Sequence, residues 1–282
     1  MKSKKVLIIA EAGVNHNGSL KLAKLLVDAA KKSGADIIKF QTWITEELVD
    51  KSAPKAKYQK ENDGIFTSQF EMLKKLELSQ NDFKQLKNYC DKKKIKFLST
   101  PDEEKSLHFL VDKLGMDLIK VGSGEVNNIP FLKKIGAKRK KVILSTGMST
   151  IVEVEKAYKT LLDSGAKEVA LLHCTSNYPA PFNSINLTAM LQLKNVFGVE
   201  YGYSDHSEGT EVSVAAVALG ATIIEKHFTL DKNMLGPDHT ASMSPDELIL
   251  LVKQIRNVEL AMSGSGVKEP TILEMETKKV IQ

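Results

Sequence analysis

The chain has 282 residues, of which 42% are hydrophobic and 27% are charged. This balance is that of a folded globular protein and excludes a disordered, collagen-like or disulfide-dense chain. The length fits a single α/β barrel, so we expect one domain over residues 1–282. The net charge of +5 comes from dispersed lysines, with Arg139 and Arg256 as the only arginines, and a nucleic-acid partner is therefore not expected.

No stretch of the sequence resembles a signal peptide or a membrane span. The apolar run that begins at Val6 is cut short by Glu11. No other run approaches the roughly 18 apolar residues that a membrane helix needs. Cys90 and Cys174 are too few for a disulfide framework. We therefore expect a cytoplasmic protein with reduced thiols and no membrane partner.

Short aliphatic runs recur along the chain, and segments with helical spacing separate most of them. In chain order these runs begin at Val6, Ile37, Phe97, Leu118, Val142, Val169, Tyr201 and Ile223. Strands that alternate with helices form parallel sheets, and eight such units favour closure into a (β/α)8 TIM barrel of the α/β class. The first strand is not followed by G-x-G-x-x-G, so a dinucleotide-binding fold is the weaker alternative.

Each predicted strand runs from aliphatic residues into a polar carboxyl-terminal end, which is where such barrels carry their active sites. A single Ser or Thr at this place has an ordinary role in capping a strand. Charged side chains lose hydration when they are grouped on one rim. Such groupings occur mainly at active sites, so we expect an active site there. The polar strand-end residues are Glu11, Lys39, Gln41, Thr100, Lys120, Ser145, Thr146, His173, Ser204, His206, Glu225 and His227.

His206 and His227 end consecutive strands and should be neighbours in a closed barrel. Neutral imidazoles placed in this way are natural ligands for a divalent transition metal. No third ligand is obvious, and a site with two histidines would leave positions open for substrate oxygens, which suits a Lewis-acid role. We therefore interpret the pair as metal ligands rather than as satisfied core histidines.

Lys39 and Lys120 lie inside apolar runs, where surface lysines rarely occur. Their ammonium groups could meet over the barrel mouth and, with nearby hydroxyl groups, form an anion site of phosphate size. The hydroxyl donors on this rim are Thr100, Ser123, Ser145 and Ser204.

Five carboxylates fall near the same rim, where they are available for sugar hydroxyls, metal-bound water or proton transfer. They are Glu11, Glu125, Asp205, Glu225 and Asp238. The sequence does not divide these roles among them.

Short motifs along the whole barrel resemble, in order, the N-acetylneuraminate (sialic acid) synthase family, including its legionaminic and pseudaminic acid relatives. They are AEAGVNHNG (10–18), KFQ (39–41), STP (99–101), IKVGSGE (119–125), STGM (145–148), HCTSNYPAP (173–181), GYSDH (202–206), EKHFTLD (225–231) and GPDH (236–239). The resemblance implies a metal-dependent transferase that forms a C–C bond between C3 of phosphoenolpyruvate and the aldehyde of N-acetylmannosamine or a related N-acyl amino sugar. Its products would be a nonulosonic acid and inorganic phosphate.

The resemblance also implies a role for each rim residue. His206 and His227 would hold the metal, commonly Mn²⁺, with Mg²⁺ and Co²⁺ as alternatives, while Glu125, Glu11 and Lys120 would act at the reacting centre. The residues implied to bind phosphoenolpyruvate are Lys39, Thr100, Lys120, Ser123, Ser145 and Ser204. Those implied to bind substrate beside it are Gln41, Tyr178 and Asp238, with the contact from Ser176 or Asn177 left open.

Family members usually continue beyond the region GSGVKEPTILE (264–274) into a small antifreeze-like domain, which is absent from residues 1–282. In the family this domain reaches across a dimer and supplies an arginine to the N-acyl group of the sugar. Neither Arg139 nor Arg256 is placed to replace it. We therefore expect weak sugar binding unless a homodimer or a separate antifreeze-like domain protein completes the site. The segment 42–79, which is long for a strand-to-helix connection, is an alternative cover for the mouth.

Two other functions are alternatives to this condensation. Another phosphoenolpyruvate-condensing enzyme, which makes 3-deoxy-sugar acids from phosphorylated aldoses, should carry rim arginines for the second phosphate, and the rim has none. A non-catalytic sugar-binding descendant would be favoured by loss of a metal histidine or a rim lysine, and none is lost.

Overall fold

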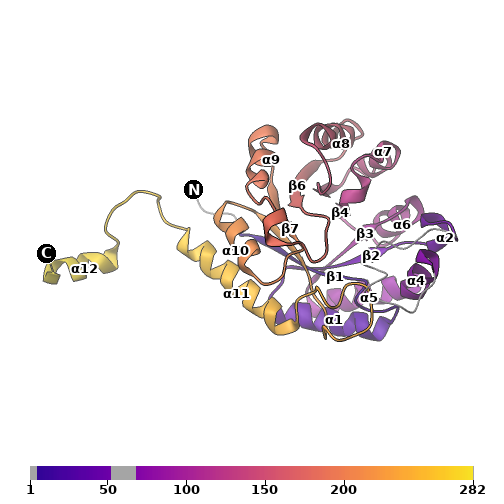
Figure 1. The fold of residues 1–282 in the computed structure, drawn as a ribbon, viewed down its shortest axis with the longest axis horizontal. Coiled ribbons are helices and arrows are strands. Elements are labelled where there is room, and N and C mark those ends of the chain that lie inside the picture. Colours follow the sequence, from indigo (N-terminus) through magenta and orange to yellow (C-terminus); the bar gives the residue numbers. More distant parts are fainter. Residues whose placement is uncertain (1–4, 52–67, 282) are drawn as a thin grey trace.

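In the computed structural model, which describes residues 5–51 and 68–281, eight parallel strands are surrounded by helices (Figure 1). The strands are β1 (Leu7–Gly13), β2 (Ile37–Thr42), β3 (Lys96–Pro101), β4 (Leu118–Val121), β5 (Lys141–Ser145), β6 (Glu168–Cys174), β7 (Tyr201–Asp205) and β8 (Ile223–His227). All eight predicted strands are confirmed, each beginning within one residue of its predicted start.

The strands pair in the order β3-β2-β1-β8-β7-β6-β5-β4, and β3 lies beside β4 at the remaining seam. The predicted TIM barrel is therefore confirmed. The register sets Glu11 of β1 opposite both Lys39 of β2 and His227 of β8, and it sets Ser204 of β7 opposite Glu225 of β8. The polar strand ends thus lie at one level around the barrel mouth.

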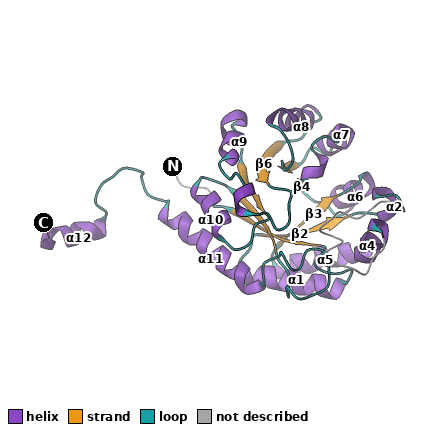
Figure 2. Cartoon of the chain, viewed as in Figure 1, coloured by secondary structure: helices purple, strands orange, loops and turns teal. Residues whose placement is uncertain are grey.

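Helices cover the outside of the strands, apart from the last helix, which projects away from them (Figure 2). They are α1 (Leu20–Ser33), α2 (Thr45–Leu48), α4 (Gln69–Leu76), α5 (Gln80–Lys93), α6 (Glu104–His108), α7 (Ile129–Ala137), α8 (Ile151–Asp163), α9 (Ala189–Phe197), α10 (Glu211–Ala218), α11 (Pro245–Ala261) and α12 (Ile272–Ile281). A π-helical turn η1 (Phe109–Lys113) extends α6, and two 3₁₀ turns are η2 (Ser123–Glu125) and η3 (Phe182–Ser184). The bounds follow local chemistry: Ser79, Thr150 and Ser244 each begin a helix with a capping box.

The segment 42–79 contains α2 and α4, while its residues 52–67 lie outside the described part of the chain. Trp43 and Met72 are buried and pack in one apolar cluster with Val14, which follows β1. This cluster lies beside the carboxyl ends of β1 and β2 and forms one wall of a cavity described below. The described residues of the segment therefore stand at the edge of the barrel mouth.

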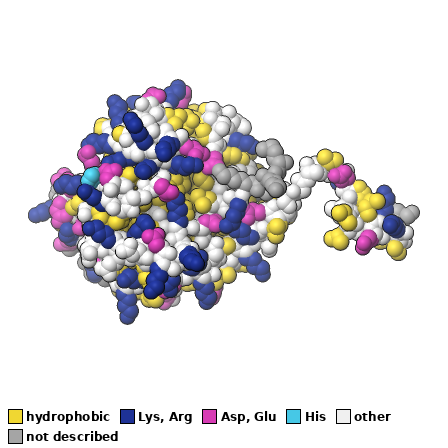
Figure 3. Space-filling model, turned by 180° about the vertical axis from the view of Figure 1, so that it is seen from behind, with side chains coloured by type: hydrophobic (Ala, Val, Ile, Leu, Met, Phe, Trp, Pro, Cys, Tyr) yellow, Lys and Arg dark blue, Asp and Glu magenta, His cyan; other side chains and the backbone are white. Residues whose placement is uncertain are grey.

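Helix α12 projects away from the barrel, and its Ile272, Leu273 and Val280 side chains are exposed (Figure 1). No helix in residues 5–51 and 68–281 is long and apolar enough to cross a membrane. Figure 3 shows basic side chains spread among acidic ones over the face that it draws.

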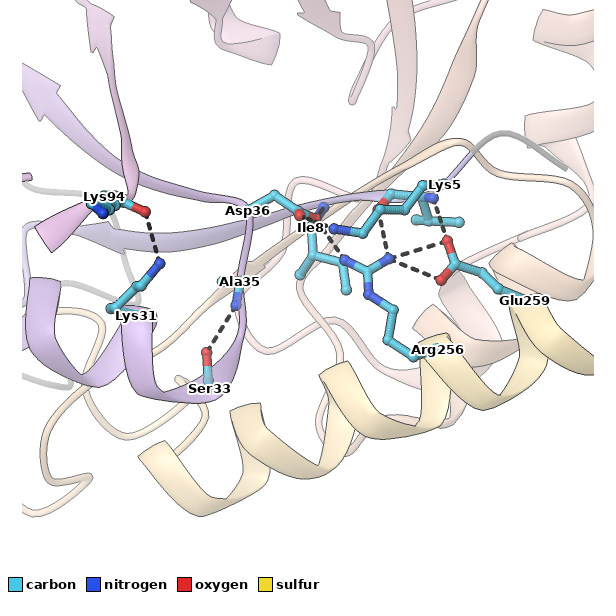
Figure 4. A network of polar contacts seen from close by, with 10 residues as sticks. Lys5, Ile8, Lys31, Ser33, Ala35, Asp36, Lys94, Arg256 and Glu259 are labelled. Carbon is cyan, nitrogen blue, oxygen red and sulfur yellow. Dashed lines mark hydrogen bonds and ion pairs between the residues drawn. The ribbon is translucent and has the colours of Figure 1, made fainter. Parts of the chain in front are cut away.

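A polar network ties the last barrel helix to the amino-terminal ends of β1 and β2, at the opposite end from the mouth (Figure 4). Asp36 accepts hydrogen bonds from Lys5 Nζ at 2.6 Å, from the Ile8 N–H at 3.0 Å and from Arg256 Nη2 at 2.7 Å. Partial burial disfavours the charged carboxyl, but these donors outweigh it and hold the pKa of Asp36 below its ordinary value. Asp36 therefore joins α11 to the sheet as a carboxylate.

We expect Asp36→Ala to lower the free energy of unfolding by about 2 kcal/mol at pH 7, because hydrogen bonds to charged groups are lost. A carboxyl with a lowered folded-state pKa stabilises the fold above the unfolded-state pKa of about 3.9 and loses that effect as the pH falls through the folded-state value. The difference between wild type and variant should therefore persist at pH 5 to 7 and shrink below about pH 4. Urea unfolding across this range measures it. The exposed-site control Asp163→Ala should change stability by less than about 0.5 kcal/mol, and an equal loss in both variants would contradict the assignment.

Candidate active site

Two buried lysines at the barrel mouth share one carboxylate. Lys39 projects from β2 and Lys120 from β4, and both are almost fully buried. The Glu225 carboxylate of β8 lies 3.6 Å from Lys39 Nζ and 3.5 Å from Lys120 Nζ. Ser204 Oγ donates a hydrogen bond to the same carboxylate at 3.0 Å. The structure thus brings together two lysines that lie 81 residues apart in the sequence.

Each lysine also contacts a strand-end hydroxyl group that the sequence assigns to the anion site. Lys39 Nζ lies 3.0 Å from Glu11 Oε1 and donates to Thr100 Oγ1 at 3.1 Å. Lys120 Nζ donates to Ser145 Oγ at 2.7 Å. Because β1 to β5, β7 and β8 supply these groups, barrel closure is what assembles them.

The pKa values of Glu11 and Glu225 are shifted in opposite directions. Burial raises the pKa of Glu11 above its ordinary value despite the neighbouring Lys39. Burial also disfavours the charged form of Glu225, but Lys120 and Lys39 outweigh it and hold the pKa of Glu225 low. A proton on Glu11 leaves two ammonium groups facing one carboxylate. The mouth then carries a net positive charge, which favours an anionic ligand.

Ser123 and Ser176 converge beside the lysines around Gly147. The Gly147 N–H donates to Ser123 Oγ at 2.9 Å. A Cβ atom at position 147 would lie 2.3 Å from Ser176 Oγ, so only glycine lets the backbone approach this closely. Ser176 and Asn177 are exposed and line a cavity of about 670 Å³. The Asn177 side chain donates to the Pro179 carbonyl at 3.1 Å, which holds it in its own turn.

His206 and His227 face each other at the mouth, with ring centroids 5.4 Å apart and an interplanar angle of 75°. His206 Nδ1 lies 2.9 Å from the Thr175 carbonyl oxygen. Since that oxygen can only accept, it places the proton on Nδ1 and leaves Nε2 as a lone-pair donor. The buried His227 Nδ1 has no hydrogen-bond partner in the described part of the chain. Tyr178 lies against both imidazoles, with ring centroids 5.4 and 4.7 Å away.

This pair of imidazoles has the chemistry of a two-histidine metal site. Burial, together with the neighbouring His206 and Lys39, keeps the pKa of His227 well below its usual range, so its ring stays neutral as a ligand must. No group of three or more His, Cys, Asp and Glu side chains suited to a metal occurs within residues 5–51 and 68–281. The residues therefore fit a divalent ion that takes its remaining ligands from water and substrate.

The remaining predicted residues lie on the side of the mouth toward α2 and α4. Gln41, Glu125 and Asp238 line a cavity of about 310 Å³. A Cβ atom at position 13 would lie within 3.6 Å of Gln41, Glu11 and His227, which places this cavity beside the histidines. Burial raises the pKa of Asp238 to about 6.

Hydrogen bonds hold Tyr178, Asp238 and Glu125 in place. The Tyr178 and Ser242 hydroxyls lie 2.8 Å apart, and Ser242 Oγ donates to the Asp238 carbonyl at 2.7 Å. Asn128 Nδ2 donates to Glu125 at 2.7 Å. These contacts fix the side chains of Tyr178 and Glu125.

One rim carboxylate has a different role from the one that the sequence suggests. Asp205 is buried in an ion pair with Lys226 at 2.9 Å and accepts hydrogen bonds at 2.6 Å from Ser207 and Ser213. With its oxygens already engaged, Asp205 is not available for sugar hydroxyls or proton transfer. Its side chain points to the opposite face of β7 from that of the adjacent Ser204, because side chains alternate along a strand.

Sequence reasoning misses two residues of the site. Ser242 lies in a loop without strand or helix periodicity, and no sequence signal identifies it. Asp102 follows the STP motif directly and lines the 310 Å³ cavity, but the acidic run of residues 102–104 is typical of a helix start. Its position immediately after a strand end is the signal that could have identified it.

Comparison with known proteins agrees with this arrangement. The NeuB family model matches residues 26–268. An N,N'-diacetyllegionaminic acid synthase of Campylobacter jejuni is 50% identical over 281 residues, which cover 99% of this chain and 84% of that protein. Another of Legionella pneumophila is 47% identical, covering 98% of this chain and 78% of that protein. The crystal structure of a sialic acid synthetase from Leptospira borgpetersenii, in complex with citrate, superposes with a TM-score of 0.86 at 35% identity, covering 98% of this chain and 91% of that one.

The Campylobacter jejuni relative matches the whole barrel, and the family model includes every strand that carries a lysine or a histidine of the mouth. The resemblance that the strand-end motifs indicate is thereby confirmed. This chain belongs to the NeuB family.

Proposed function

We propose that this protein is a C–C bond-forming transferase that condenses phosphoenolpyruvate with an N-acyl amino sugar, giving a nonulosonic acid and inorganic phosphate. The observation that carries the proposal is the pair of buried lysines sharing Glu225 next to two facing histidines. An anion site and an electrophile-activating site on one rim are what this condensation requires.

The lysines and hydroxyl groups of the mouth are the donors that would bind phosphoenolpyruvate. Lys39 and Lys120 supply point charges for the carboxylate and phosphate of phosphoenolpyruvate. The hydroxyl groups that would complete its binding are those of Thr100, Ser123, Ser145, Ser176 and Ser204. Ser145 is already aligned by its 2.7 Å contact with Lys120, so little reorganisation is needed when the anion binds.

His206 and His227 would hold a divalent metal, with Mn²⁺ as the first candidate and Mg²⁺ and Co²⁺ as alternatives. The lone-pair nitrogen of His206 and the unpartnered Nδ1 of His227 support this assignment. When bound, the metal would act as a Lewis acid toward the aldehyde of the acceptor. Tyr178 lies against both imidazole rings and would keep bulk water from that side of the acceptor.

The reaction balances with one water molecule. As the new bond forms between C3 of phosphoenolpyruvate and the aldehyde carbon, the oxygen of that water adds to C2 and the C2–O bond to phosphate breaks, which leaves the water oxygen as the keto oxygen of the product. One proton of the water ends on the former aldehyde oxygen and the other on the released phosphate. Glu11 and Glu125 are the rim carboxyl groups suited to move these protons. Burial raises the pKa of Glu11, which makes it a better proton donor near neutral pH than an exposed glutamate.

The acceptor of this reaction should carry no phosphate group. A phosphorylated aldose needs basic side chains for its second anion, and arginine is the residue best suited to that role. Arg256 is paired with Asp36 and Glu259 at the opposite end of the barrel. Arg139 precedes β5 and lies beside Gly165, also away from the mouth. This placement disfavours synthases that act on phosphorylated aldoses.

The test is phosphate release from phosphoenolpyruvate in the presence of Mn²⁺ and an acceptor panel of N-acetylmannosamine, a bis-acetamido hexose and a phosphorylated aldose. We expect release that depends on an N-acyl amino sugar, with the mass of the nonulosonic acid in the product. The bound metal is checked separately by calorimetry. Release with the phosphorylated aldose alone, or none with any sugar despite binding of metal and phosphoenolpyruvate, would contradict the proposal.

A further inference from the structure

The 310 Å³ cavity beside the mouth has two chemically different sides. Its polar lining residues are Gln41, Gln69, Asp102, Glu125 and Asp238, and most of its other lining residues form an apolar wall. The apolar wall is formed by Val14, Trp43, Leu48, Met72, Leu73 and Leu76. Its volume lies at the lower end of the range for small-molecule pockets, which is roughly 300–1,000 Å³. The cavity therefore has room for a substituent of the acceptor beside the apolar wall.

The six residues of the apolar wall have no free polar group to offer a ligand, and Gln69 is the polar side chain of α4 that lines the cavity beside them. Trp43 and Met72 are buried, and Leu48 and Leu73 are partly buried. The indole N–H of Trp43 is already donated to Thr45 Oγ1 at 3.1 Å. A hydroxyl or ammonium group placed against this wall would lose its hydration without gaining a partner, whereas a methyl group would be stabilised there.

Asp102 is one of the polar residues that line the cavity together with the apolar wall. Its N–H donates to the Thr42 carbonyl at 3.0 Å, which fixes the start of its side chain at the end of β2. Within the described part of the chain, its carboxyl makes no hydrogen bond or ion pair, and Glu103 rather than Asp102 caps α6. Asp102 is therefore not needed for the helix start and is free to bind a ligand.

The charge state of Asp102 also disfavours an ionic ligand. Burial, opposed by Lys39 and reinforced by Glu125 and Glu11, raises the pKa of Asp102 to about 8. The carboxyl is then largely protonated at neutral pH, and it can donate one hydrogen bond as well as accept others. An amide, which offers both an N–H and a carbonyl oxygen, matches it better than a phosphate or an ammonium group.

We propose that this cavity is the subsite for a second acylamino substituent of the acceptor, with Asp102 hydrogen-bonded to its amide and the apolar wall in contact with its methyl group. The inference rests on the proposed function, because it assumes that the acceptor binds at this mouth. It makes Asp102 a specificity-determining residue that distinguishes a bis-acetamido hexose from a sugar with one acetamido group.

The experiment compares kcat/KM for the bis-acetamido hexose and for N-acetylmannosamine in the wild type, Asp102→Ala and Asp102→Asn. We expect the wild type to prefer the bis-acetamido hexose. Asp102→Ala should lower kcat/KM for that sugar about tenfold, as loss of one hydrogen bond of about 1.4 kcal/mol does. The readout is the ratio of kcat/KM for the two sugars, which should fall about tenfold. Asp102→Asn, which keeps a donor and an acceptor, should retain most of the preference.

Two further variants keep the test independent of any folding defect. Leu73→Gln places a polar group in the partly buried part of the wall and should lower the preference about threefold, because contact with a buried methyl group is lost. Glu104→Gln changes an exposed carboxylate of α6 that is paired with Lys134, and it should leave the preference unchanged.

The outcomes separate this inference from the proposed function. An equal loss of kcat/KM for both sugars in Asp102→Ala, or a wild type that prefers N-acetylmannosamine or a bis-amino hexose without acyl groups, would overturn the subsite. A wild type that condenses none of these sugars would instead overturn the proposed function. Unchanged kinetics in both Asp102→Ala and Leu73→Gln would also exclude the cavity from acceptor binding.

Discussion

Replacing either His206 or His227 with alanine is expected to lower Mn²⁺ affinity by more than about 100-fold, since loss of a group that merely orients a ligand already costs 10–100-fold. The two rings are 5.4 Å apart and offer one lone-pair nitrogen each, so neither can replace the other. Sugar-dependent phosphate release should fall at least about 1,000-fold in each variant, in the range found when an electrostatic stabiliser of the transition state is removed. The double variant should be no worse than either single one, because both act through one ion.

Calorimetric titration with Mn²⁺ measures affinity independently of turnover. The matched control is His173→Gln, because His173 also ends a strand but its Nε2 contacts the Ile185 carbonyl at 2.8 Å. This control should bind Mn²⁺ as the wild type does. Removal of metal with a chelator should abolish phosphate release in the wild type. It should change the affinity for phosphoenolpyruvate by no more than a few-fold. Full Mn²⁺ affinity in His206→Ala would exclude the histidine pair as the site.

The barrel could be predicted because its strands alternate regularly with amphipathic helices. The rim could be predicted because every strand changes from aliphatic to polar residues at its carboxyl end, and barrel closure then brings such ends together. Lys39 and Lys120 illustrate this: each is a lysine inside an apolar run, and only burial at the mouth explains both.

The assignment of the carboxylates could not be predicted in the same way. Asp205 and Glu225 each lie two residues or fewer from a mouth histidine, and the sequence offers both as rim carboxylates. Which face of the strand each occupies depends on the register of β7 and β8, and the structure places Asp205 against Lys226 and Glu225 between the two mouth lysines. The role of each carboxylate therefore depends on its partners from distant strands and not on the local sequence pattern.

The same limit applies to Asp102. Its neighbours in the cavity come from β2, α4 and the loop after β8, which are contacts across the fold that a short window of sequence does not contain. A local pattern therefore identifies the charged strand ends at the barrel mouth better than the residues of the cavity beside them.

Lys120→Met is expected to lower kcat/KM for phosphoenolpyruvate by about 1,000-fold, because it removes the buried charge that we propose binds the anion and that contacts Ser145. It should also destabilise the free protein, since Glu225 then keeps only Lys39 as a cationic partner.

Glu225→Gln should lower the free energy of unfolding by about 3 kcal/mol, because it leaves two buried ammonium groups without their shared carboxylate. Added phosphate should stabilise Glu225→Gln more than the wild type and stabilise Lys120→Met less, because the anion substitutes for the missing negative charge only in the former.

Unfolding of the two single variants and of Lys120→Met/Glu225→Gln gives the coupling between the residues. The double variant should be more stable than the sum of the single losses predicts by at least about 1.5 kcal/mol, because removing both members of a buried pair leaves no unpaired charge. The exposed pair Lys159 and Glu155 on α8 provides the control cycle, in which coupling should stay below about 0.5 kcal/mol. Equal coupling in the two cycles, or a phosphate response that is the same in Glu225→Gln and Lys120→Met, would mean that Glu225 does not set the charge balance of the mouth. The expected result would instead explain why an anion site contains a carboxylate: Glu225 holds the two ammonium groups in place until the substrate's own negative charges arrive.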